Sequence, residues 1–351
     1  MTCRQPLVAV LLALSPVGCQ ADAGRCDDVA DASPEGDLSD APDGGLLPLN
    51  LASISTWGRA DGFGGEGHEE GQFSYPSGIA LSSDESRVYV FDIGNRAIKV
   101  MLRDGTPIDS WPAAVIPDST GGSGIAVAPD GTVYVADDTI HGVAGYSPDG
   151  SVRHSWRLAN VRPYRSYEGH PHDLIVSSDG NIVVAEAGLG QLQVFTPDGA
   201  LLRTIGERGT EKGQFQGGPG GVAELGGRFY ATDFKPGAHP FGHTILIFEQ
   251  DGRYVGMVPP PQGALMPALA TLIVSWHGWL FVGAADEPPE IILGQAPGFQ
   301  RLTHRWEGSR GVFPGELNAP YDAAVDAQGR WYVTELYNHR VQVFQSNLTT
   351  P

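Results

Sequence analysis

Histidines are the side chains of this sequence whose grouping most directly suggests chemistry. Four of the ten fall in two short segments, Gly169–Asp173 and Gly237–His243. Neutral imidazole is the commonest zinc ligand, and an imidazole beside a carboxylate can act as a general base. We predict one site from both segments, with three metal ligands and two further ligand-binding groups: His172, His239 and His243, with His170 and Asp173. The alternative is that His172 fills a channel mouth and the second segment is an exposed loop.

Carboxylates form a second set of candidates. An acid stands at the end of the second predicted strand in each repeat unit described below: Asp92, Asp137, Glu186, Asp233, Asp286 and Glu335. Such a ring could hold a metal, but an acid at this place more often caps the next turn and pairs with an Asn or Arg inside it. We therefore expect a structural role, with these pairs: Asp92 with Asn95 or Arg96, and Glu335 with Asn338 or Arg340.

Two more candidates stand where the last repeat unit begins. Tyr321 and Asp322 occupy the places that His172 and Asp173 occupy in the third unit. We assign both to the ligand-binding set. Asp173 and Asp322 are hard oxygen ligands of the kind that calcium takes, although two such ligands do not complete a site. Zinc and calcium are therefore the candidate metals, and the sequence completes a ligand set for neither.

Nucleophilic catalysis finds no motif in this sequence. There is no Gly-x-Ser-x-Gly segment, and the three cysteines, Cys3, Cys19 and Cys26, all precede the repeat region. A serine elbow or a cysteine nucleophile is therefore not expected.

The candidates are positioned by a unit of about fifty residues that recurs to the C-terminus. Its clearest copy holds four short apolar runs, with Asp130-Gly131 and Asp149-Gly150 between them. Alternating runs rich in Val, Ile and Tyr indicate strands, and Asp-Gly favours tight hairpin turns. Six units are predicted: Ile79–Trp111, Ser123–Trp156, Leu174–Ile205, Val222–Val258, Leu272–Trp306 and Ala323–Phe344.

The sixth unit stops after its third strand, and its missing strand is predicted at the other end of the chain. Ile54–Gly58 resembles the fourth strands that end at Trp111, Trp156 and Trp306. Pairing it with the last unit would remove two exposed sheet edges. The predicted fold is an all-β, six-bladed β-propeller of four-stranded blades, with the last blade closed by the N-terminal strand near residues 51–57. The tryptophans are expected to pack between blades.

The first and last units resemble the NHL repeat. The matching residues of the first unit are Gly71-Gln72-Phe73, Pro76–Ala80, Tyr89–Asp92 and Asn95-Arg96, and those of the last are Phe313, Pro320, Tyr332–Glu335 and Asn338–Phe344. The resemblance spans residues 51–345 and is weakest in the fifth unit, at Glu287–Glu290. It implies a secreted or lipoprotein-type bacterial NHL-repeat propeller. The family includes binding modules, scaffold domains and a few enzymes, so the resemblance implies a fold more than a function.

One enzymatic group with this fold, the peptidyl-hydroxyglycine amidating lyases, holds zinc with histidines at strand starts of different blades. His172 alone matches that pattern here, because the equivalent residues are Ser77, Ser123, Gly220, Ala270 and Tyr321. Propeller lactonases instead hold calcium in the channel, and Asp173 and Asp322 are the residues that resemble such ligands.

The N-terminal region predicts export. Residues 1–19 combine Arg4, an apolar run too short to span a bilayer, and Gly18-Cys19, which resembles the end of a lipobox apart from Pro16. Lipidation of Cys19 and ordinary signal cleavage both remain open. Residues 20–46 carry eight acids and one base, which is typical of a flexible solvated tether. Residues 47–347 form the predicted propeller.

Charge narrows the choice of partners. The chain has 41 acids and 22 bases, and removing the signal and tether leaves 33 acids and 20 bases, a net charge of −13. This balance argues against nucleic acid.

We therefore predict a monomeric binding or scaffold module, secreted or anchored in the periplasm or outer membrane. It would take a protein or glycan ligand on its channel face and contact a membrane through a lipid on Cys19 alone. The alternative is a metal-dependent lyase or hydrolase with its site on the channel face, which is less favoured because the catalytic set is incomplete.

Overall fold

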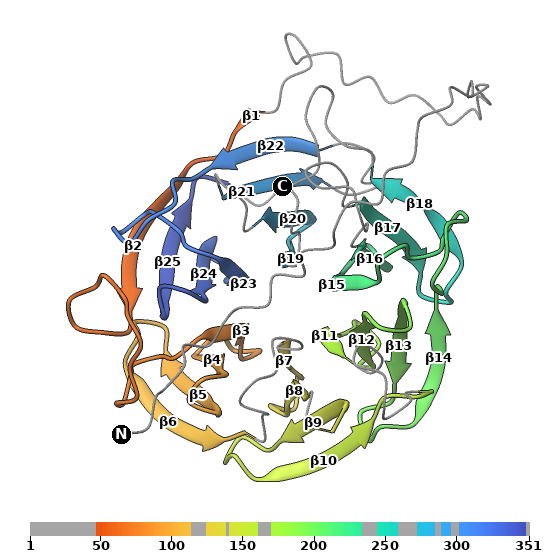
Figure 1. Ribbon diagram of the computed structural model, residues 1–351, viewed down its shortest axis with the longest axis horizontal. Helices are drawn as coiled ribbons and strands as arrows, with labels where there is room; N and C mark the ends of the chain where they lie inside the picture. The colour runs from red at the N-terminus through yellow and green to blue at the C-terminus, as the bar shows by residue number, and fades with distance from the viewer. Residues whose placement is uncertain are drawn as a thin grey trace, which may run out of the picture. The chain divides into compact units, whose positions relative to one another are not determined.

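The computed structural model describes residues 47–113, 124–137, 140–160, 170–233, 244–258, 272–284, 289–295 and 302–348. Within these residues the strands form six sheets around a common centre (Figure 1). The described residues all lie in one compact unit, Asp43–Pro351. The first strand of each sheet lies innermost, so each sheet is a blade. The predicted all-β, six-bladed propeller is confirmed.

The strands follow one another from the centre of each blade outwards. Blades 1 and 2 comprise β3 (Pro76–Leu81), β4 (Arg87–Asp92), β5 (Ala97–Leu102) and β6 (Pro107–Pro112), then β7 (Ile125–Val127), β8 (Val133–Asp137), β9 (Gly142–Tyr146) and β10 (Val152–Arg157). Blades 3 and 4 comprise β11 (Pro171–Val176), β12 (Ile182–Glu186), β13 (Gln191–Phe195) and β14 (Leu201–Ile205), then β15 (Pro219–Leu225), β16 (Arg228–Asp233), β17 (Thr244–Glu249) and β18 (Tyr254–Val258). Blade 5 comprises β19 (Leu272–Trp276), β20 (Trp279–Ala284), β21 (Glu290–Gln295), β22 (Leu302–Glu307) and β1 (Leu47–Pro48). Blade 6 comprises β23 (Pro320–Val325), β24 (Arg330–Glu335), β25 (Arg340–Ser346) and β2 (Leu51–Trp57).

Blade 6 takes its outer strand from the N-terminal side of the propeller. β2 pairs antiparallel with β25, and this places Leu51 opposite Ser346 and Trp57 opposite Val341. The outward-facing backbone groups of β25 thereby gain hydrogen-bond partners in β2. The predicted closure by residues 51–57 is confirmed.

β1 is an element that the sequence pattern does not predict. Leu47 and Pro48 pair in parallel with His304 and Arg305 of β22. The next residue, Leu49, is buried, and its backbone N–H donates to the Arg305 carbonyl at 2.8 Å. Two residues carry no periodicity, so a strand of this length escapes detection by pattern.

The structure does not test the predictions made for the N-terminal region. Residues 1–46, including the predicted signal, the tether and Cys19, lie outside the described residues. Among the residues that are described, no helix is long and apolar enough to cross a membrane. Cleavage and lipidation therefore stay predictions.

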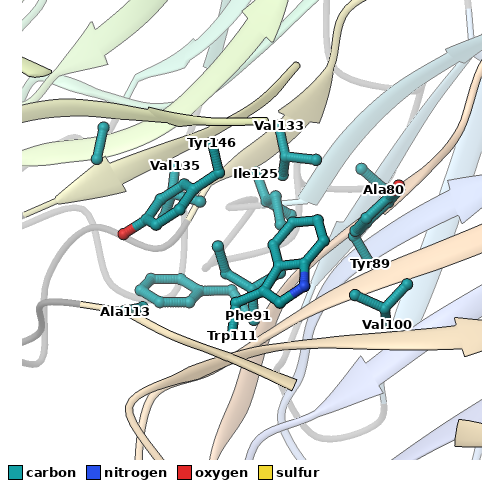
Figure 2. Close-up of a cluster of buried hydrophobic side chains, with 12 residues drawn as sticks. Ala80, Tyr89, Phe91, Val100, Trp111, Ala113, Ile125, Val133, Val135 and Tyr146 are labelled. Carbon is teal, nitrogen blue, oxygen red and sulfur yellow. The ribbon is translucent and has the colours of Figure 1, made fainter. Parts of the chain in front are cut away.

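The outer-strand tryptophans pack between blades, as predicted. Trp111 of blade 1 packs against Tyr89, with ring centroids 5.6 Å apart, and shares a buried cluster with Tyr146 of blade 2 (Figure 2). A turn glycine of the following blade lies directly on the indole, because a Cβ added to Gly150 would stand 2.4 Å from Trp111 Cδ1. The same relation holds for two further pairs: Gly105 on Trp57, and Gly199 on Trp156. Glycine is thus needed for close approach as well as for positive φ.

Gly150→Ala should therefore lower the free energy of unfolding more than Gly180→Ala does. Both glycines turn with nearly equal φ, +81° and +82°, but nothing lies within 4 Å of a Cβ at Gly180. The control carries the strain of a left-handed alanine, about 1 kcal/mol, and Gly150→Ala adds about 1–3 kcal/mol for the displaced indole. Urea unfolding measures both. Equal losses would contradict the proposed packing between blades.

Candidate functional site

The inner strands of all six blades enclose a central cavity of about 590 Å³. Most of its lining is aliphatic, and two carboxylates, Asp173 and Asp322, stand near the starts of β11 and β23. Blades 3 and 6 are three positions apart in the ring, on opposite sides of its centre (Figure 1). Each of them contributes one of the two carboxylates. The structure thus brings together two of the predicted ligand-binding residues.

Each of these aspartates joins two blades. In blade 6, Asp322 Oδ1 accepts the Ala323 N–H at 2.7 Å, and Oδ2 accepts the Ile79 N–H of blade 1 at 2.8 Å. In blade 3, Asp173 makes the matching pair of bonds, to the N–H groups of Leu174 at 2.8 Å and of Val222 in blade 4 at 2.9 Å. Both carboxylates therefore act as clamps between neighbouring inner strands.

A local bulge gives Asp322 its direction. The pairing of β23 with β24 shifts register between Pro320 and Ala323, and an extra residue at such a shift re-aims the side chain. The Thr334 hydroxyl fixes the bulge, because its Oγ1 accepts the Asp322 N–H at 3.1 Å and donates to the Ser77 carbonyl at 2.5 Å. The clamp is thus built by the strand behind it.

Glycine takes the corresponding place in three other blades, at Gly78, Gly124 and Gly221. A Cβ on Gly124 would lie 2.7 Å from Asp173 Oδ1, so the carboxylate needs a glycine in the preceding blade. The clamp that Asp173 forms therefore requires a glycine at this place in blade 2.

Burial raises the pKa values of both clamps. The pKa of Asp322 rises to about 7 because protein surrounds the carboxyl, although the backbone N–H groups of Ile79 and Ala323 oppose the change. The pKa of Asp173 lies well above its usual value, first because of burial and then because of the charge of Asp322. Both residues keep partial access to the channel. With a pKa of about 7, the Asp322 carboxyl is partly protonated at neutral pH.

The acids at the ends of the second strands, which we call the outer ring, have structural roles wherever the structure describes their side chains, as expected. Asp92 accepts the Ser74 N–H at 2.8 Å and the Asn95 side-chain amide at 2.6 Å. Asp233 accepts three consecutive backbone N–H groups, Gln216 to Gly218, at 2.9–3.1 Å. Glu186 caps the turn after its own strand through the N–H groups of Gly188 and Leu189. The side chain of Asp137 and all of Asp286 lie outside the described residues.

The last acid of the ring has a larger role than the sequence suggested. Glu335 accepts from Arg340 Nε at 2.5 Å and from Asn338 Nδ2 at 2.7 Å, so both of its expected pairs form. The Arg340 side chain is fully buried. Its Nη1 donates to the carbonyl oxygens of Gly62, at 3.1 Å, and Val312, while Nη2 donates to the backbone carbonyl oxygen of Glu316 at 2.9 Å. One guanidinium therefore fixes two loops that are far apart in sequence.

These loops display an aromatic pair that the sequence analysis missed. Phe63 and Phe313 meet edge to face, with ring centroids 5.8 Å apart, and both are exposed. We call Phe63, Val312 and Phe313 the aromatic surface. A sequence signal existed, since both aromatics stand in loops rich in glycine where no strand needs a buried side chain.

The structure describes only part of the predicted histidine site. His172 lies in β11 with partial exposure, and the His170 ring lies 6.0 Å from that of His141. Tyr321 precedes Asp322 in β23 and is also partly exposed. The other two predicted metal ligands, His239 and His243, lie outside the described residues. Across the described part of the chain, no three His, Cys, Asp or Glu residues are grouped to hold a metal ion.

A scan against models of protein families gives no match. Over 182 residues the chain is 28% identical to NHL repeat-containing protein 3 of Mus musculus, which covers 49% of this chain and 50% of the relative. The chain thus matches about half the length of that curated relative.

Solved structures with a similar fold include two enzymes. A gluconolactonase from Xanthomonas campestris has a TM-score of 0.56 and 17% identity, with 88% of this chain and 99% of that chain covered. Virginiamycin B lyase from Staphylococcus aureus has a TM-score of 0.55 and 14% identity, with 87% and 96% covered. At these identities the likeness concerns the fold alone.

The repeat, the ring and its closure define a six-bladed β-propeller of four-stranded blades. Over about half of its length the chain is similar to an NHL repeat-containing protein.

The raised pKa of Asp322 predicts a dependence of stability on pH. Its folded pKa of about 7 exceeds the ordinary value of 3.8, so the folded state binds the proton more tightly. The resulting stabilisation is present below pH 4 and is lost as pH rises through 7, by at most about 1.4 kcal/mol per pH unit for one group. Asp322→Asn should flatten the decline in unfolding free energy between pH 5 and 8.

Asp84→Asn is the matched control for this measurement. Hydrogen bonds from Ser82 and Ser86 lower the pKa of this exposed carboxyl to about 2, so it does not titrate between pH 5 and 8. Chemical unfolding at several pH values gives the slopes. An Asp322→Asn slope equal to that of the parent would count against the buried charge.

Proposed function

We propose that this propeller is a binding or scaffold module that takes a protein or glycan ligand on its channel face, the face where the inner strands begin. The observation that carries this proposal is the aromatic surface, which is exposed yet held by the buried Arg340. An apolar patch that the fold leaves in water is typical of an interaction site. A buried charge that fixes its backbone lowers the entropy cost of binding.

The polar groups of the same face support a binding role over catalysis. The described acids of the outer ring accept bonds from loop backbones or side chains, as Asp92, Asp233 and Glu335 do. A carboxylate engaged in this way holds a loop and has less freedom to act on a substrate. The carboxylates of this face therefore hold its loops in place.

A metal-dependent lyase or hydrolase is the second candidate. It is favoured by the cavity of about 590 Å³, with Asp173 and Asp322 facing into it, and by the enzymes among the proteins of similar fold. The described residues do not fit a metal well. Both carboxylates already accept two backbone N–H groups, and no three His, Cys, Asp or Glu side chains of the described residues are grouped to hold an ion. We therefore derive no step through zinc or calcium.

The proposed module is an exported monomer. We infer that the module works outside the cytoplasm, secreted or held at the envelope by a lipid on Cys19, because of the signal-like residues 1–19. We also infer that it is a monomer that binds no nucleic acid, given its excess of acids. Mass spectrometry of the mature N-terminus separates lipidation from ordinary cleavage.

One experiment separates binding from catalysis. The immobilised full chain is tested against the exported proteins of its source and against a glycan array, alongside Phe63→Ala/Phe313→Ala and the control Leu202→Ala, which alters an exposed outer-strand residue of blade 3. The binding role predicts a retained ligand whose affinity falls at least tenfold in the double variant and is unchanged in the control.

Elemental analysis of the same preparation tests for the enzymatic alternative. Stoichiometric zinc or calcium that is lost in Asp173→Asn or Asp322→Asn, together with turnover of a lactone, would replace the binding role by the enzymatic one.

A further inference from the structure

The aromatic surface is a built feature of the propeller. Phe63, Val312 and Phe313 are 48%, 44% and 59% exposed, and Tyr337, in the neighbouring turn before Asn338, is 46% exposed. Scattered apolar residues are ordinary on a surface, but here two loops from opposite ends of the propeller chain meet ring to ring. Such convergence leaves apolar area in water that the fold itself does not use.

The backbone beneath these side chains is fixed from both sides. Besides the Arg340 bonds to Gly62 and Val312, the Phe63 N–H donates to Asp61 Oδ1 at 3.2 Å and the Phe313 N–H to Glu316 Oε2 at 3.0 Å. Gly64 packs directly on the backbone of the turn, since an added Cβ would overlap the Asn338 carbonyl oxygen. The surface is therefore preorganised, and a ligand need not order it.

The loop that carries Phe63 has a surplus of acidic side chains. The loop 58–75 holds four acids and one arginine: Asp61, Glu66, Glu69, Glu70 and Arg59. Arg59 itself lies 3.7 Å from Asp61, so its charge is partly matched within the loop. The other loop, 308–319, is balanced, with Arg310 and Glu316. A phosphate, a nucleic acid or an acidic peptide would meet repulsion here, whereas a cation would be attracted.

Exposed aromatic rings on a loop that is rich in acids suit one chemistry in particular. A lysine or arginine can lie over an aromatic ring while its charge faces an acid, and an apolar neighbour can cover the remaining ring area. A neutral sugar would use the rings but gain nothing from the surplus of carboxylates. The pairing of the two features therefore points to a peptide that is both basic and apolar.

We propose that the aromatic surface and the acidic loop 58–75 dock a basic segment of a partner protein, one that carries an aromatic or aliphatic anchor between lysines or arginines. This inference rests on the proposed binding function and names its partner class. The anchor packs on Phe63 and Phe313, and the flanking cations face Glu66, Glu69 and Glu70.

Fluorescence polarisation with the full chain tests the proposal. The probe is a labelled twelve-residue peptide of alternating lysine and leucine with one central tryptophan; matched peptides replace lysine by glutamate, or leucine and tryptophan by serine. We expect a dissociation constant of ~1–100 µM for the first peptide and at least tenfold weaker binding for both others. Raising the salt from about 50 to 300 mM should weaken binding severalfold.

Variants locate the site. Phe313→Ala should weaken the basic peptide at least tenfold and Glu69→Gln/Glu70→Gln about threefold, while Leu202→Ala leaves it unchanged. These side chains are exposed, so the variants should keep the parent unfolding midpoint. No binding up to 1 mM, equal binding of the glutamate peptide, or indifference to Phe313→Ala would each overturn the proposal.

The two proposals fail separately. A glycan, or a protein without a basic segment, that depends on Phe313 overturns the basic-peptide inference and leaves the binding function standing. A chain that holds a metal, turns over a lactone and retains no ligand overturns both.

Discussion

The buried ion pair of Glu335 and Arg340 is the interaction on which the channel face depends most. Both side chains are fully buried, so neither charge has water to solvate it, and removing one partner would strand the other. The pair is tolerated because the remaining donors of Arg340 are taken by loop carbonyls. Gln342 completes the group, with Nε2 donating to Glu335 at 2.7 Å and to the Glu316 carbonyl at 2.6 Å. The hydrogen bonds that satisfy the buried ion pair thus also fix the two loops.

Other blades hold their loops of the channel face with different side chains. At the strand position of Gln342, Gln193 exchanges two hydrogen bonds with the backbone of Ala159, and Lys99 reaches the Glu69 carbonyl at 3.4 Å. The inner clamps Asp173 and Asp322 work at a cost, since their raised pKa values mean that the fold disfavours their charged form. Side chains at this strand position therefore hold loops in blades 1, 3 and 6, and among the described residues the loops that Arg340 holds carry an exposed aromatic pair.

The sequence predicts the fold far better than the site. Period, alternation and Asp-Gly turns recur in each unit, so the blades, the closure by residues 51–57 and the packing of Trp111 all follow from local patterns. Arg340 was expected to pair with Glu335, but its bonds to two distant loops depend on the closed ring, which no local pattern encodes. The direction of Asp322 depends on a bulge whose effect cannot be read from spacing. The meeting of Phe63 with Phe313 likewise needs three dimensions.

Hydrogen exchange of the Arg340→Lys variant tests the central claim most directly. An ammonium cannot span the carbonyls that the guanidinium joins, although it preserves the charge beside Glu335. Residues 58–65 and 308–317 should lose amide protection together, while residues 214–218, which Asp233 holds in blade 4, should keep theirs. Unchanged protection in both loops, or a loss confined to one of them, would contradict the view that one buried pair fixes the binding face.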